Sequence, residues 1–188
     1  MGLYIENEFN YPFDFDIDTV GSQVVKATLD FENCPYEADV GLLLTNDEYI
    51  EKLNAEYRNI HKPTDVLSFP INDRARIEDI FSTCNLSNLL IEDEEDENLK
   101  EELSVDQAEL LSSFDPDSGS LILGDIVISV DTLIRQAGEF GHSIKREYAF
   151  LIVHSMLHLL GYNHVEEMER ETMEEKQERI LDKLKIAR

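Results

Sequence analysis

A strongly apolar segment, YAFLIVHSMLHLL at 148–160, carries two histidines that its fold has to accommodate. His154 and His158 are four residues apart, so on a helix both imidazoles leave the same face about one turn apart. That separation suits two ligands of one Zn²⁺ ion. Gly161 follows where the helix should end, because glycine readily adopts the left-handed conformation of a helix terminator. The chain can then turn back and bring His164 to the same ion.

This pattern predicts one zinc ion per chain, held by His154, His158 and His164, with a fourth position open as in catalytic zinc sites. The competing interpretation is that they are core residues with satisfied hydrogen bonds, the usual role of a single histidine on an apolar helix. Burying three imidazoles without a shared partner would leave polar nitrogens unsatisfied in an apolar segment. We therefore favour the metal site.

The residue after the first histidine bears on the chemistry of this metal. The spacing His-x3-His-x2-Gly-x2-His equals that of metzincin proteases. Those enzymes need a glutamate directly after the first histidine, as the general base for water. Here that residue is Ser155, which has no carboxylate. A zinc-dependent, metalloprotease-like hydrolase of another substrate is thus an alternative that the mechanism disfavours.

The rest of the chain alternates short apolar runs with amphipathic stretches, which indicates an α/β or α+β domain with one modest sheet. We expect the α+β class, in a zincin-like arrangement: a small mixed sheet of about four strands packed by helices, with the metal-site helix in the C-terminal half. Asn46 and Asp47 can cap a helix. The expected strands are 3–7, 38–45, 65–69 and 121–129, and the expected helices are about 18–32, one after 46–47, then about 131–140, 143–160 and 165–186.

The charge of the chain is unevenly distributed. The formal net charge is −25, and residues 73–119 hold fifteen acidic and three basic residues, or −12, which leaves −13 for the rest. The centre of this stretch, IEDEEDEN at 91–98, is a block of like charge that repels itself. We therefore expect residues 1–188 to form a single domain, interrupted by an acidic, flexible insertion at about 73–119.

The expected compartment is the cytoplasm. No run of about 18 apolar residues could span a bilayer, and the N-terminus carries acids where a signal peptide needs a basic flank. Cys34 and Cys84 are too few and too far apart for a disulfide framework. The excess of acid also argues against a broad basic surface for nucleic acid.

Three segments together resemble the YbeY-type endoribonuclease family, also called rRNA maturation factors. The segment HSMLHLLGYNH, at 154–164, is similar to the family's H-G-x-L-H-L-x-G-Y-D-H helix motif. NAEYRNIHKPTDVLSFP, at 54–70, is similar to its N-x-x-Y-R and P-T-D-V-L-S-F-P segments, and LGDIVIS, at 123–129, to its L-G-D-I-x-I-S strand. The resemblance covers residues 1–72 and 120–188.

The resemblance implies a metal-dependent endoribonuclease that is specific for single strands, acting in maturation of the 3′ end of small-subunit rRNA and in late ribosome quality control. The implied partners are single-stranded RNA or rRNA and the ribosomal subunit or ribosome-associated proteins, with no membrane. Arg58 matches the arginine of the family segment and can clamp a phosphate through its planar fork. A zinc ion would let water attack a phosphodiester near neutral pH. The implied catalytic residues are Arg58, His154, His158 and His164.

Two positions depart from the family motif. Ser155 stands where glycine is usual, which adds a hydroxyl near the predicted site, and Asn163 stands where aspartate is usual, so this side chain cannot act as a base. Asp65 and Asp125 lie in the matched segments and are expected to be structural, capping or orienting a ligand histidine. A non-catalytic ribosome-associated factor with a structural zinc is the remaining alternative.

Overall fold

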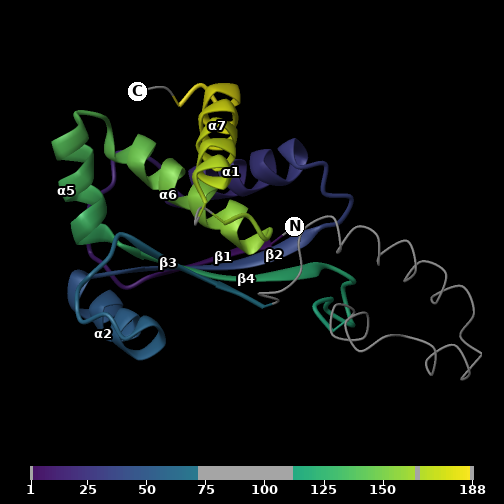
Figure 1. Ribbon diagram of the computed structural model, residues 1–188, viewed down its shortest axis with the longest axis horizontal. Helices are drawn as coiled ribbons and strands as arrows, with labels where there is room; N and C mark the ends of the chain where they lie inside the picture. The colour runs from purple at the N-terminus through teal and green to yellow at the C-terminus, as the bar shows by residue number, and fades with distance from the viewer. Residues whose placement is uncertain (1, 72–111, 164–165, 187–188) are drawn as a thin grey trace, which may run out of the picture.

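The computed structural model describes residues 2–71, 112–163 and 166–186, which form one sheet with helices on both faces (Figure 1). Every strand and helix expected from the sequence is present. The strands are β1 (Gly2–Asn7), β2 (Ala38–Thr45), β3 (Val66–Pro70) and β4 (Leu121–Ser129). The helices are α1 (Ile17–Phe31), α2 (Asp47–Arg58), α5 (Val130–Phe140), α6 (Ile144–Leu159) and α7 (Glu167–Lys183).

The sheet has the order β1-β2-β4-β3 and is mixed. β1, β2 and β4 run parallel, and β3 pairs antiparallel with β4 at one edge. The central strands β2 and β4 read as nearly continuous apolar runs, as expected for strands covered on both faces. The predicted α+β class with a small mixed sheet of about four strands is confirmed.

The two faces of the sheet carry different numbers of helices. α1, α5, α6 and α7 lie together on one face, and α2 lies alone on the other (Figure 1). On the four-helix face, α6 is buried along most of its length, and Tyr148 is fully buried with its hydroxyl donating to the Ile17 carbonyl at 3.1 Å. This helix therefore crosses the core, which explains why its sequence is apolar on almost every side.

The helices begin at side-chain caps that are visible in the sequence. The Asn46 carboxamide oxygen accepts a hydrogen bond from the Tyr49 amide at 2.8 Å, which confirms the predicted cap of α2. Ser129 caps α5, and Ser143 caps α6 through the Arg146 amide. These caps fix where each helix starts relative to the element before it.

The predicted acidic insertion at about 73–119 lies largely outside the described residues. Its last part, 112–119, is described: it forms turns and a bridge from Phe114 to Leu121 that leads into β4. Phe114 also packs edge-on against Tyr36, with the two ring centroids 5.3 Å apart. In the described part of the chain, no helix is long and apolar enough to cross a membrane.

Candidate active site

The two helical histidines of the predicted metal site face each other. His154 and His158 lie one turn apart on α6, and their Nε2 atoms are 3.2 Å from each other. The ring planes are nearly perpendicular, at 82°, with centroids 4.6 Å apart. The i,i+4 spacing therefore brings the two nitrogens to one point, as the sequence predicts.

Each ring is held from behind by a second contact. The Nδ1 atom of His158 lies 2.9 Å from the Tyr162 carbonyl oxygen, and the Nδ1 atom of His154 lies 2.7 Å from the Gln177 amide nitrogen of α7. Such partners fix the orientation of metal-ligating histidines. Both Nε2 atoms are consequently directed toward each other and into the same cleft.

The turn after α6 has the geometry predicted from Gly161. This residue has φ of +88°, in the left-handed region that favours glycine. The Tyr162 amide donates to the Leu157 carbonyl and the Gly161 amide to the His158 carbonyl, both at 2.9 Å. These two bonds form a Schellman motif. The motif returns the chain toward α6 and puts the Tyr162 carbonyl beside the His158 ring.

The donor set fits a tetrahedral zinc ion at these two positions. Ligand nitrogens about 2.0–2.1 Å from a tetrahedral ion are about 3.3 Å from each other, close to the Nε2 separation of 3.2 Å here. The third predicted ligand, His164, lies outside the described residues. Among the residues that are described, no group of three or more His, Cys, Asp or Glu side chains could hold a metal ion.

The two histidines line a cleft of about 490 Å³ that also contains Arg58. Arg58 is exposed at the last turn of α2, so it reaches the cleft from the opposite face of the sheet, around β3. Asn163 lines the same cleft. The structure thus brings Arg58 to the cleft of His154 and His158, although about a hundred residues separate them in the sequence.

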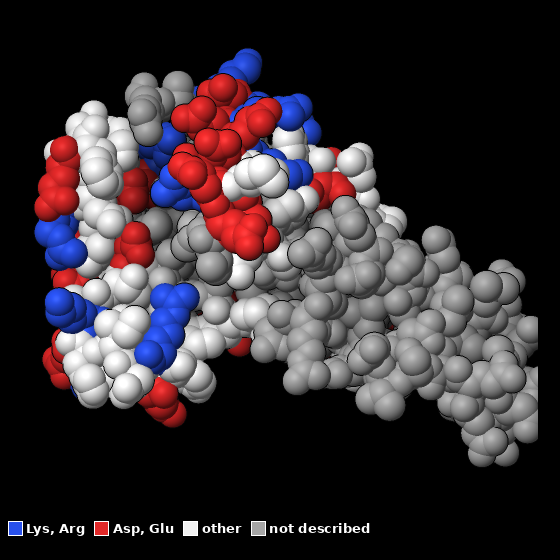
Figure 2. All heavy atoms as spheres, viewed as in Figure 1, with Lys and Arg blue, Asp and Glu red and all other residues white. Residues whose placement is uncertain are grey.

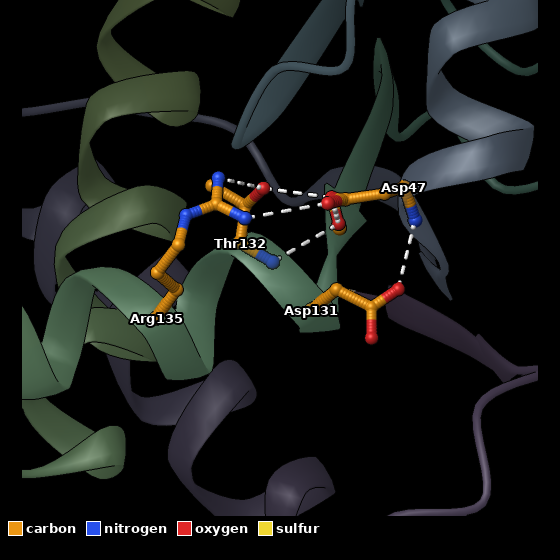
Figure 3. A network of polar contacts seen from close by, with 5 residues as sticks. Asp47, Asp131, Thr132 and Arg135 are labelled. Atoms are coloured by element: carbon orange, nitrogen blue, oxygen red, sulfur yellow. Dashed lines mark hydrogen bonds and ion pairs between the residues drawn. The ribbon is translucent and has the colours of Figure 1, made fainter.

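A polar network holds the other end of α2 in place (Figure 3). The Asp47 carboxylate accepts hydrogen bonds from Ser129 and, at 2.7 Å, from the Thr132 hydroxyl, and it lies 3.4 Å from Arg135. The Asp47 amide donates to Asp131 at 3.0 Å. The network ties the start of α2, the helix that carries Arg58, to the start of α5.

The balance of burial and hydrogen bonding sets the ionisation of Asp47. Partial burial opposes its charge most strongly, but the hydrogen bonds from Ser129, Thr132 and Arg135 together hold the pKa of this carboxyl below its ordinary value. Asp47 is therefore charged at neutral pH, and the network is intact there.

Asp65 makes structural hydrogen bonds beside the cleft, and Asp125 lies elsewhere. The Asp65 carboxylate accepts hydrogen bonds from the Val66 amide at 2.8 Å and from the Gln136 amide at 3.1 Å, and it lines the cleft. Asp125 is exposed and lines a groove on the α2 face of the sheet together with Gly41, so it does not orient a cleft histidine. A side chain at Gly41 would collide with Asp125.

Ser155 does not line the cleft. It is fully buried on the core side of α6, and its hydroxyl has no hydrogen-bond partner among the described residues. The departure from the glycine of the family motif thus places a hydroxyl in the apolar core, while the cleft itself is unchanged by it. This position therefore supplies no carboxylate to the cleft.

A second titratable pair lies at the start of α6. His142 and Glu147 are both buried, and Nε2 of His142 is 3.0 Å from the Glu147 carboxylate. Burial raises the pKa of Glu147 to about 7, the nearby Asp65 charge adds to this shift, and Arg146 opposes it. These residues line a cavity of about 460 Å³ that shares Asp65 with the histidine cleft.

Sequence reasoning missed two glutamines, Gln136 and Gln177, that hold residues of the cleft. Gln177 is buried among the charged residues of α7, where only its place at helical spacing from Met173 and Ile180, both buried, could have shown that it faces inward. Gln136 is half-buried on α5, and nothing in its local sequence indicates a contact with Asp65.

Comparison with known proteins identifies the family of this chain. The family model described as Endoribonuclease YbeY matches residues 4–185. The chain belongs to the YbeY family. The YbeY match includes all five helices described above, β2, β3 and β4 in full, β1 from Tyr4 onward, and all residues of the histidine cleft.

Relatives support this membership over the full length. A protein named Endoribonuclease YbeY from Lachnoclostridium phytofermentans is 46% identical over 188 residues, covering all of both chains. A protein of the same name from Agathobacter rectalis is also 46% identical over all of both chains. The solution structure of TM1509 from Thermotoga maritima shares the fold, with a TM-score of 0.51 and 17% identity, over 98% of this chain and 92% of that one.

Proposed function

We propose that this protein is an endoribonuclease acting in rRNA maturation that uses one zinc ion, held by His154, His158 and His164, to cleave single-stranded RNA at the 3′ end of small-subunit rRNA. The endoribonuclease activity and its role in rRNA maturation follow from membership of the YbeY family. The observation that supports the metal is the pair of Nε2 atoms, 3.2 Å apart and each backed by a second contact on its ring.

The side chains of the cleft have different roles in this mechanism. The histidines would hold the ion, which as a Lewis acid would let water act as a nucleophile near neutral pH. Arg58 faces the same cleft and can bind two phosphate oxygens through its guanidinium fork. It would hold the phosphodiester in place and offset the charge that develops on the phosphoryl oxygens. Asn163 can donate a hydrogen bond in the cleft but cannot remove a proton.

The charge of the surface around the cleft suggests that a partner brings the RNA to this protein. Acidic side chains gather along α7, whose exposed residues include Glu171, Glu174 and Glu175 (Figure 2). Such a surface repels phosphate, so long stretches of backbone cannot be bound by charge alone. We infer that the ribosomal subunit or a ribosome-associated protein delivers the RNA in the cytoplasm, late in ribosome assembly, where ribosome quality control also takes place. Free protein should then bind bare RNA weakly.

Two alternatives make different predictions. A metalloprotease-like hydrolase needs a carboxylate where this chain has Ser155, which lies buried away from the cleft. A non-catalytic factor with a structural zinc should lose helicity and melting temperature when a chelator removes the ion, whereas a catalytic zinc should mainly cost activity. Cleavage assays with casein and with RNA, each with and without a chelator, distinguish the endoribonuclease from these two alternatives.

The decisive experiment measures bound zinc and RNA cleavage on identically purified wild type and His158→Ala. We expect about one zinc per wild-type chain, and loss of both zinc and cleavage in the variant. His61→Ala is the matched control, because His61 is exposed and should change neither measurement. Full cleavage by a metal-free His158→Ala protein would refute the mechanism.

A further inference from the structure

A cavity of about 460 Å³, here called the α5–α6 cavity, lies beside the histidine cleft, between the end of α5 and the start of α6. Asp65 lines both the cavity and the cleft, and its carboxylate accepts a hydrogen bond from Gln136 of α5 at 3.1 Å. A smaller cavity of about 280 Å³, lined by Asp65, Phe150 and His154, adjoins both. An RNA strand with a phosphate in the cleft therefore has adjoining space for a neighbouring nucleotide.

The charged groups of the α5–α6 cavity do not favour a phosphate. Its walls include the carboxyl groups of Asp65 and Glu147, opposed by the guanidinium of Arg146. Glu147 is 3% exposed and lies 3.0 Å from the His142 ring. A phosphate in this cavity would face two carboxylates, which repel it. An uncharged group with N–H donors, such as the edge of a nucleobase, suits acceptors of this kind.

Aromatic rings line the same cavity. Phe140, the last residue of α5, is 67% exposed, and its ring centroid lies 6.0 Å from that of His142. Phe150 is half-buried, and the Arg146 guanidinium lies over its ring, 5.3 Å from the centroid. A phenylalanine as exposed as Phe140 adds little to the core, but its ring can stack on a flat ligand. Stacking of a base on an aromatic side chain strengthens binding about 5- to 100-fold.

We propose that the α5–α6 cavity is a nucleotide subsite, in which a base close to the scissile phosphate stacks on Phe140. This inference rests on the proposed cleavage of single-stranded RNA in the histidine cleft, and it deepens that function. A base in a duplex is stacked between its neighbours, and its Watson–Crick edge is already paired. Only an unpaired base can enter the cavity, so the subsite gives a physical reason for a preference for single strands.

The groove on the α2 face provides the matched control. It also carries exposed aromatic side chains, and Tyr4 is as exposed as Phe140, at 67%. Among the described residues that line this groove, none also lines the cleft. Asp125 lies on the floor of the groove, where its charge repels RNA. Removing the Tyr4 ring therefore tests the loss of an exposed aromatic side chain without touching the subsite.

The first test measures kcat/KM for cleavage of a single-stranded RNA oligonucleotide by wild type, Phe140→Ala, Phe140→Trp and Tyr4→Ala. We expect Phe140→Ala to lower kcat/KM about 5- to 100-fold, mainly by raising KM, because a stacking contact is lost. Phe140→Trp keeps an aromatic face and should cleave as well as wild type, and Tyr4→Ala should not change cleavage. Wild-type kcat/KM in Phe140→Ala would overturn the subsite.

RNAs with one abasic nucleotide show whether the lost contact is with a base. The abasic nucleotide replaces each position on either side of the cleaved bond in turn. At one position it should lower kcat/KM of wild type by about the same factor as Phe140→Ala does, and it should have no further effect in Phe140→Ala, since both changes remove the same contact. Equal losses in wild type and Phe140→Ala at every position would overturn the subsite.

A binding measurement separates the subsite from the proposed function. The same RNA carries 2-aminopurine, a fluorescent adenine analogue whose emission falls when it stacks, at each flanking position in turn. We expect wild type and Tyr4→Ala to quench the emission at one position, and Phe140→Ala to quench it much less. Quenching by a wild type that cleaves no RNA would support the subsite and overturn the proposed function. Cleavage without quenching that depends on Phe140 would overturn the subsite alone.

Discussion

The two faces of the sheet are packed very differently. On one face, four helices bury a continuous apolar core that includes nearly all of α6. On the other, α2 alone packs through a small cluster of Ile50, Leu67 and Val127. Beside α2 an open groove of about 590 Å³ remains, and Tyr4 and Tyr57 are 67% and 63% exposed along it.

The cleft combines contributions from both faces. The histidines come from the densely packed face, where a rigid surrounding can hold ligand atoms within the few tenths of an ångström that a metal requires. Arg58 comes from the thinly packed face, at the far end of a helix tied down through Asp47. A long arginine tolerates small shifts of its helix when it meets a phosphate. In the proposed function the metal ligands need the more precise placement, and they lie on the more densely packed face.

The largest effect should come from the thinly packed face. Arg58→Ala should lower RNA cleavage about 100- to 1,000-fold, since it removes a charged donor to the phosphoryl group. Zinc content should not change, because no described ligand or ring contact involves α2. Cleavage assays and metal analysis on the same preparation check both. Lys52→Ala, an exposed change on the same helix, is the control; loss of zinc in Arg58→Ala would show that the faces do not act separately.

A pH-dependent effect on stability should come from the densely packed face. The pKa of Glu147 is about 7 in the folded protein and 4.5 when unperturbed, so the folded state holds this proton more tightly. Its contribution to the free energy of unfolding is full below about pH 4.5 and is lost as the pH rises to about 7, amounting to at most about 3 kcal/mol. Urea unfolding at several pH values measures it.

Glu147→Gln should flatten this part of the pH profile, because a glutamine keeps an acceptor for His142 but does not titrate. The exposed Glu171→Gln is the control and should leave the profile unchanged. An identical slope between pH 5 and 7 in Glu147→Gln and wild type would contradict the raised pKa.

The smallest expected effect is on stability and concerns a buried hydroxyl in the densely packed core. Ser155→Ala removes a buried hydroxyl without a partner among the described residues and should stabilise the protein by about 1 kcal/mol, or a few degrees in Tm. Ser22→Ala in α1, at a half-buried position, corrects for the helix propensity of alanine. Calorimetry measures both. Equal increases in stability for Ser155→Ala and Ser22→Ala would contradict this prediction, because removing an unpaired buried hydroxyl should add to the effect of helix propensity.

Local signals made most of the fold predictable. Alternating periodicities gave each helix and strand within a few residues, and Asn46 and Gly161 marked helix ends by their own chemistry. The convergence of His154 and His158 also followed from spacing alone. Gln177 was missed because, among the charged residues of α7, its sequence neighbours resemble those of a solvated position.

The amino-acid sequence by itself determined the helices and strands, the shared face of His154 and His158, and the turn at Gly161, because each depends on residues within about one or two helical turns. Only the tertiary structure decided the strand order β1-β2-β4-β3, the approach of Arg58 from the opposite face, and the contact of Gln177 with His154. Those contacts join residues that are distant along the chain. They form because packing the sheet buries apolar area on both faces at once, and no periodicity within a single segment records which polar side chains that packing will bring together.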